Sequence, residues 1–210
     1  SLTRTDGTPL VLKSTAFTLT TSTNGNNKSF NDIIVRDPEG NNINITSTIN
    51  GGTLKGYLEM RDNIVENLKD KLDRLAAGFV KEFNEIHQQG FGIDGSTGNN
   101  FFKALKTTVL TNVNNTGSAK LIATNGDPSN ISIDKYEITI SGINSFTLKN
   151  LTTGSSSGTF TFQQGSSFNL ANGYAVTISG TPAVGDKFRL SASENAARNM
   201  AIGSGVLSNS

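Results

Sequence analysis

The stretch LKGYLEMRDNIVENLKDKLDRLAAGFVKEFNEIHQQ, residues 54–89, decides the fold of this chain. Apolar side chains recur in it at the a and d positions of a seven-residue repeat. We call this set the helix seam: Leu58, Val65, Leu68, Leu72, Leu75, Phe79 and Ile86. Such a repeat is typical of a helix that packs one narrow stripe against other helices. No proline interrupts it, so we predict one continuous helix, capped by Thr53 and ended by a left-handed Gly90.

The predicted helix is long for a chain of 210 residues. Its 36 residues would span about 54 Å, whereas a compact globule of this chain length would be roughly 43 Å across. We therefore expect an elongated molecule in which part of the seam lacks cover from its own chain. Leu105, Val109 and Val113 could cover one section. A short C-terminal helix, capped by Ser191 with Glu194 as a capping box, could cover another.

The segments on either side of the helix read as β-structure. Thirteen charged residues lie between Leu54 and Gln89, but only Lys149 lies between Ser141 and Gly180. Apolar and polar residues alternate in about seven short runs over residues 116–190, which predicts a sandwich or barrel-like β domain. We predict an α+β fold with a β-rich segment (1–50), the long helix and a linker (51–115), the all-β domain (116–190) and a short C-terminal helix (191–210).

Composition excludes several function classes. The net charge is +1, which gives no electrostatic basis for nucleic-acid binding. The chain has no Cys and one His, so Cys-based zinc sites and two-His metal motifs are excluded. No apolar run approaches the roughly 18 residues of a membrane span, and the first residues do not resemble a signal peptide. We expect no cofactor, no metal, no nucleic acid and no membrane.

Catalytic groups are equally scarce. His87 falls in the last turn of the helix, where a His can bond the final carbonyls, so a structural role is the better interpretation. Pairs of helix charges such as Glu66–Asp70 and Lys69–Asp73 are expected to be solvated flanks of the seam. Residues 94–100 read as a turn-rich linker, because they lack the pattern of a calcium loop or a phosphate-binding loop. An enzyme such as a glycosidase or peptidase has the least support.

A set of residues in and around the helix carries a family resemblance. They are Gly51, Gly52, Leu54, Gly56, Leu58, Arg61, Asp62, Leu72, Asp73, Leu75, Ala76, Phe79, Asn84, His87, Gly90, Phe91, Gly95, Gly98, Phe101 and Phe102. Residues 6–11 and, more loosely, residues 180–188 extend the match. With these residues the chain resembles the flagellar hook-associated protein 1 family, the junction proteins between flagellar hook and filament.

The resemblance implies a non-enzymatic structural protein of the bacterial flagellum, exported without a cleaved signal peptide and located outside the cell. Its partners would be copies of itself, the hook and the second junction protein. The family's N- and C-terminal helices pair into a coiled-coil rod. They would pack on the seam, and this chain would be a middle piece that lacks them. Which helices cover the seam, and whether residues 1–50 join the helix or the β domain, stays open.

A different class of function remains as the alternative. The all-β region could be an adhesin or a carbohydrate-binding module, which would need exposed aromatic side chains or a calcium site. Phe160, Phe162, Phe168 and Phe188 follow the strand alternation, and this placement favours a role in the core.

Overall fold

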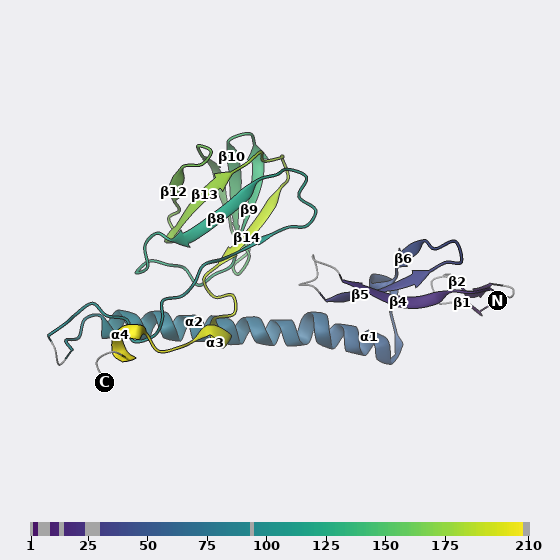
Figure 1. Cartoon of the computed structure of the whole chain (residues 1–210), viewed down its shortest axis with the longest axis horizontal. Coiled ribbons are helices and arrows are strands. Elements are labelled where there is room, and N and C mark those ends of the chain that lie inside the picture. Colours follow the sequence, from purple (N-terminus) through teal and green to yellow (C-terminus); the bar gives the residue numbers. More distant parts are fainter. Residues whose placement is uncertain (1, 4–8, 13–14, 24–29, 93–94, 208–210) are drawn as a thin grey trace. The chain divides into compact units, whose positions relative to one another are not determined.

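The computed structural model describes residues 2–3, 9–12, 15–23, 30–92 and 95–207, and it has an α+β fold (Figure 1). The chain divides into two compact units, residues 1–67 and residues 68–210, which are described separately. Asp6, Gly7 and Thr8, which carry part of the family resemblance, lie outside the described residues, as does Asp94 of the predicted linker.

The first unit contains two small antiparallel sheets. Strands β1 (Leu2–Thr3), β2 (Pro9–Leu12) and β3 (Thr15–Ala16) form one sheet. Strands β4 (Thr18–Thr23), β5 (Asn31–Arg36) and β6 (Asn42–Asn44) form the other, followed by the 3-10 turn η2 (Thr46–Thr48). The turn between β5 and β6 is closed by Asp37, whose carboxylate accepts the Asn41 N–H at 2.7 Å. Gly40 supplies the left-handed residue of this turn, with φ 90°.

Residues 52–87 are helical without interruption, so the 36-residue helix is confirmed. It comprises α1 (Gly52–Glu59), the π-helical segment η3 (Met60–Val65) and α2 (Glu66–His87). The predicted ends are wrong. Gly51 precedes the helix and Gly52 has φ 75°, so Thr53 lies inside the first turn and cannot cap it. Gly90 does not have a positive φ; its N–H bonds the His87 carbonyl at 3.1 Å.

The second unit contains the β domain. One sheet has the order β11 (Ser156–Thr161), β10 (Ser145–Asn150), β9 (Tyr136–Gly142), β14 (Lys187–Ser191) and β7 (Thr108–Thr111). The other has the order β12 (Ser167–Asn169), β13 (Tyr174–Ser179) and β8 (Lys120–Asn125). All pairings are antiparallel, and the two sheets do not close into a barrel.

The two sheets of this unit share one hydrophobic core. Ile138, Phe146 and Phe188 of the larger sheet and Val176 and Ile178 of the smaller one are almost completely buried in the same cluster. The alternation seen in the sequence places these side chains on the inner faces. Two residues expected to cover the seam, Leu105 and Val109, pack against this core instead, because β7 pairs with β14.

The C-terminal segment also differs from expectation. Ser191 ends strand β14 and does not cap a helix. The short helix α3 (Ala196–Asn199) is preceded by Asn195 in the left-handed conformation, with φ 57°, and α4 (Ser204–Leu207) follows. Glu194 is used in ion pairs with Lys69 and Lys135, so the predicted capping box does not form. Within the described residues, no helix has the length and apolar content that crossing a bilayer requires.

Candidate assembly surface on the long helix

One side of α2 presents an apolar row to solvent. Between 51% and 72% of the surface of each residue in this exposed row is accessible; its members are Leu68, Leu72, Leu75, Phe79 and Ile86. From Leu68 to Phe79 the members lie three or four residues apart, and Ile86 follows seven residues after Phe79, as one helix face requires. Several large apolar side chains exposed along one helix face are typical of an interaction site.

The seam does not extend unchanged into the first unit. Val65 is about half exposed, whereas Leu58 is buried with Val35, Ile45 and Ile49. The π-helical segment between Leu58 and Val65 explains the difference. A π-helical turn contains more residues than an α-helical turn, so each residue rotates less about the axis and positions seven apart no longer share a face. Leu58 is therefore an internal core residue of this unit, and its assignment to an uncovered seam is wrong.

The opposite side of α2 is covered by its own chain. Asp73, Ala77, Val80 and Asn84 form a second, buried row at helical spacing. Beside this row, a Cβ built on Gly78 would lie 3.7 Å from Ile133. The helix thus has one occupied face and one face that nothing in this unit fully covers.

The end of α2 is anchored by polar contacts. The Asn84 side-chain oxygen accepts the Phe102 N–H at 2.8 Å, and its amide nitrogen donates to the Phe102 carbonyl at 3.0 Å. His87 Nδ1 donates to the Asn99 carbonyl at 2.8 Å. The following segment pairs with the C-terminal one, since Phe102 bridges Ile202 and the Lys103 N–H donates to the Ala201 carbonyl at 2.9 Å.

An aromatic cluster lies beside these anchors. Phe83 stacks at a tilt on Phe101, with ring centroids 4.9 Å apart, and meets Phe102 edge-on at 5.3 Å. Phe79 of the exposed row lies 5.6 Å from the Phe102 ring, and His87 lies 5.5 Å from Phe101. The structure therefore brings together four residues singled out by the family resemblance, and it joins them to one end of the exposed row.

Four further residues of the family resemblance lie in the first unit, namely Gly51, Gly52, Arg61 and Asp62. Arg61 binds the Asp62 carboxylate through its Nε at 2.5 Å and donates to the Asn31 carbonyl at 2.8 Å. The same guanidinium lies 5.2 Å from the centre of the Phe30 ring. The hydrogen bond to Asp62 raises the pKa of Arg61, which strengthens its role as a fixed cation. Gly51 and Gly52 form the turn into the helix.

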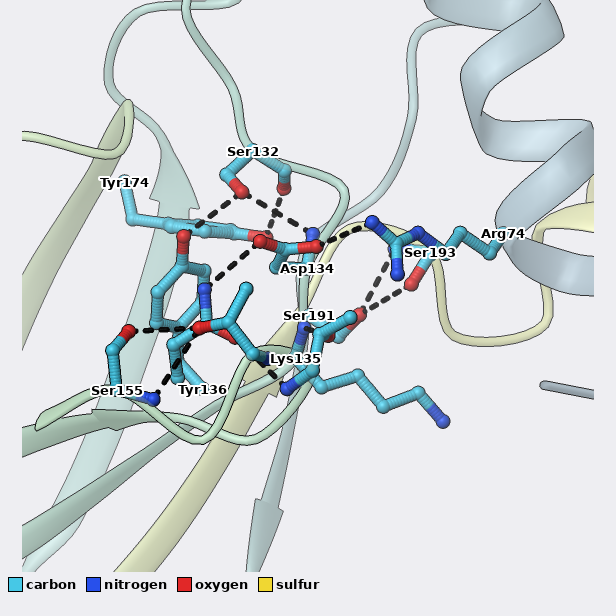
Figure 2. A network of polar contacts seen from close by, with 12 residues as sticks. Arg74, Ser132, Asp134, Lys135, Tyr136, Ser155, Tyr174, Ser191 and Ser193 are labelled. Atoms are coloured by element: carbon cyan, nitrogen blue, oxygen red, sulfur yellow. Dashed lines mark hydrogen bonds and ion pairs between the residues drawn. The ribbon is translucent and has the colours of Figure 1, made fainter. Parts of the chain in front are cut away.

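The helix charges beside the buried row are paired with other parts of the chain; Asp73 is buried, whereas Lys69, Asp70 and Arg74 keep part of their surface in water. Asp73 is almost fully buried, and its two carboxylate oxygens accept the N–H groups of Asn195 and Ala197 at 3.1 and 3.0 Å. Asp70 binds Lys135 of the β domain at 2.7 Å. Arg74 binds Asp134 at 3.0 Å, as Figure 2 shows. Burial lowers the pKa of Lys135, but the hydrogen bond to Asp70 and the charge of Glu194 raise it overall. Sequence patterns within the helix could not predict these partners, because the partners lie far away along the chain.

Other chemistry finds no support in the described part of the chain. No group of three or more His, Asp or Glu side chains there could hold a metal ion. Phe162 and Phe188 are buried, and Phe160 and Phe168 pack against the same core, so these rings do not form an exposed aromatic platform. The exposed row on α2 is the strongest candidate surface.

Comparison with known proteins finds relatives among flagellar junction proteins. The family model of the flagellar hook-associated protein FlgK helical domain matches residues 1–102. Flagellar hook-associated protein 1 of Escherichia coli K12 is 31% identical over 204 residues, which cover 96% of this chain and 37% of that protein. The protein of the same name from Salmonella typhimurium LT2 is 29% identical over 144 residues, covering 68% of this chain and 26% of that one.

A solved structure shows the same fold. The flagellar hook junction protein FlgK from Burkholderia pseudomallei matches with a TM-score of 0.68 and 25% sequence identity, over 94% of this chain and 37% of that one. The chain thus spans little more than a third of the length of the E. coli and B. pseudomallei proteins.

Proposed function

Residues 1–102 belong to the family of FlgK helical domains, and from this premise we propose that the chain is a structural part of the bacterial flagellum that joins hook to filament. In this role the chain has no catalytic task. The work is mechanical: a helix provides an apolar face for packing, and the β domain provides lateral contacts.

The observation that carries the proposal is the exposed row on α2. Full burial of a large apolar side chain contributes about 1.5–3 kcal/mol, and each of the five members keeps more than half of its surface in contact with water. Covering the row would therefore contribute several kcal/mol before the entropy of association is subtracted. Such a face fits packing in a coiled-coil manner against further helices.

We assign the cover of this row to helices of the same family, supplied by flanking segments of the full-length protein. The relatives are more than twice as long as this chain, which leaves room for such helices. Copies of the protein, the hook and the second junction protein would then be its neighbours. The β domain would face outward, and the protein would reach the cell exterior without a cleaved signal peptide.

The adhesin or carbohydrate-binding alternative lacks its necessary surface. The phenylalanines that could stack on sugars pack in or against the β-domain core. We therefore keep the junction role as the proposed function.

The test uses full-length protein and purified hooks. We expect the wild-type protein to bind hooks, residues 1–210 alone to stay in solution, and a full-length Leu72→Asp variant to lose binding. Val184→Asp is the matched control, because Val184 is also exposed but lies in the β domain. Hook binding by Leu72→Asp at the wild-type level would overturn the assignment of the exposed row to assembly.

A further inference from the structure

The charged residues of α2 that face the β domain lie in an ordered arrangement. Lys69, Asp70, Asp73 and Arg74 occupy two successive turns, and each is matched by a group from residues 134–135 or 194–197. We propose that these paired groups form a docking code: together they fix the orientation of the β domain on α2. As ionic strength rises, the attraction between them weakens and this orientation becomes less well defined. The inference does not depend on the proposed function.

The first contact of the code is the ion pair between Arg74 and Asp134. The guanidinium lies 3.0 Å from one oxygen of Asp134 (Figure 2). The other carboxylate oxygen accepts the side-chain amide of Asn150 at 2.9 Å. Asn150 ends strand β10, so the sheet holds the carboxylate in position before the helix meets it.

The second contact is a chain of alternating positive and negative groups centred on Lys135. Its ammonium lies 2.7 Å from Asp70 and 3.2 Å from Glu194. Glu194 in turn lies 3.7 Å from Lys69 of the helix. Positive and negative groups therefore interleave across the interface, which is the arrangement that electrostatic complementarity favours.

The third contact is the buried Asp73. It accepts two backbone N–H groups at the start of α3 and lies 3.9 Å from Lys69. A carboxylate in this position satisfies donors that would otherwise have no partner at the helix start. The segment that leaves the β domain is thus tied to the same two turns of α2.

The pattern is selective because a shift along the helix brings like charges together. If the β domain moved by one turn, Lys135 would leave Asp70 and approach Arg74. If it moved by one turn in the other direction, Asp134 would leave Arg74 and approach Asp70. Each movement replaces one attractive pair with a repulsive one, so the charges favour the observed register.

The apolar side chains of α2 that face the β domain are too few and too small to fix this orientation by themselves. The apolar residues in the buried row of α2 are Ala77 and Val80, with Gly78 facing Ile133 beside it. Interdomain contacts that are neither large nor hydrophobic leave the domains free to move. Since the Arg74 side chain is half exposed, its ion pair with Asp134 is open to screening by salt.

The absence of cysteine permits a direct measurement of the orientation. Spin labels on Glu82→Cys of α2 and Asn144→Cys in the β9–β10 turn would report their distance distribution by pulsed electron resonance. Both positions are exposed. We expect one narrow distribution at low salt and a broader one at 1 M NaCl, where the Debye length is about 3 Å.

Charge variants distinguish the effect of these specific ion pairs from that of a general change in charge. Arg74→Asp should broaden the distribution at low salt, and the exchanged pair Arg74→Asp with Asp134→Arg should narrow it again. Lys71→Glu is the matched control, because it reverses a charge on an exposed residue of the same turn and should leave the distribution narrow.

Two results would overturn the inference: a distribution unchanged by both Arg74→Asp and high salt, or equal broadening by Lys71→Glu. If circular dichroism shows that Arg74→Asp does not fold, the salt titration of the chain with native charges decides alone. A width that stays constant from low to high salt then counts against the code.

Discussion

Asn84 holds Phe102 by both atoms of its amide, accepting the backbone N–H and donating to the carbonyl of the same residue. This pairing imitates one rung of a β-ladder and attaches an irregular segment to the buried side of α2. Asn84→Leu should destabilise the chain by roughly 2–4 kcal/mol, since it leaves two backbone groups without partners. Urea unfolding followed by far-ultraviolet circular dichroism measures the change.

Asn67→Leu is the control for this variant, because Asn67 is exposed on the same helix, and it should cost little. Asn84→Asp keeps the acceptor and loses the donor, so its stability should fall between the two. Equal stability of the Asn84→Leu and Asn67→Leu variants would refute a role for the amide pair.

Asp73 caps α3 from a position 122 residues earlier in the chain. Asp73→Ala should cost about 1–2 kcal/mol, the usual effect of removing a helix cap. Asp73→Asn keeps an acceptor and should recover most of that stability. The two variants can be compared by urea unfolding, and an identical loss in both would show that the cap does not depend on an acceptor at this site.

Tyr174 links two segments through its buried hydroxyl. The hydroxyl donates to the Ser132 carbonyl at 2.7 Å (Figure 2). It also accepts the Ala192 N–H at 2.8 Å. Tyr174→Phe should lower the free energy of unfolding by about 1–2 kcal/mol at neutral pH. Tyr57→Phe is the control, since Tyr57 is exposed and should tolerate the change.

Tyr174 should also make the stability of the protein depend on pH in the alkaline range. Burial raises the pKa of Tyr174 above its ordinary value of 10.0. The unfolded chain then loses this proton first, so stability should fall as pH rises above about 10. The Tyr174→Phe variant should show a smaller fall, measured by thermal unfolding across that range. A fall as steep as in the wild type would assign the effect to other groups.

Asp186 closes the loop end of the β domain. One carboxylate oxygen accepts the N–H groups of Thr116 and Gly117 at 2.9 and 3.2 Å, and the other accepts that of Ala183 at 2.9 Å. Burial raises the pKa of Asp186, but these three hydrogen bonds lower it overall below 3.8. Its contribution to stability is therefore complete above that value and is lost as pH falls through the folded-state pKa.

Replacing this carboxylate tests whether Asp186 stabilises the fold at neutral pH and loses that effect in acid. Asp186→Asn should be less stable at neutral pH by about 1–3 kcal/mol, because its amide nitrogen cannot accept an N–H. Its stability should also fall less steeply in acid than that of the wild type. Glu85→Gln, at an exposed helix position, is the control and should follow the wild-type curve.

The long helix could be predicted because its signal is local and repeated. Seven-residue spacing and the absence of proline predict one helix over residues 54–89, and the structure has it at residues 52–87. The strands β9 and β13 were predictable for a similar reason, since Tyr136, Ile138 and Ile140 alternate with polar residues. Such periodic patterns reflect the geometry of each element and need no knowledge of its neighbours.

The environment of each helix position could not be predicted in the same way. Leu58 and Leu72 are the same residue type in the same repeat, yet one is buried and the other is exposed. The π-helical segment that changes the phase after Leu58 has no recognisable signal in the sequence. Likewise, Asp73 and Lys69 have the spacing of an ordinary surface pair, and only the folded chain brings Asn195 to Asp73.

The pairing of Phe102 with Ile202 also implies an order of events in time. The two residues are separated by the whole β domain, so closing this contact requires a long loop to be formed first. A chain that emerges from its N-terminal end would complete all the strands between them before this contact could form. Closure at the end of α2 would then be the final step of maturation, and until that moment the phenylalanine cluster would lack the C-terminal segment beside it.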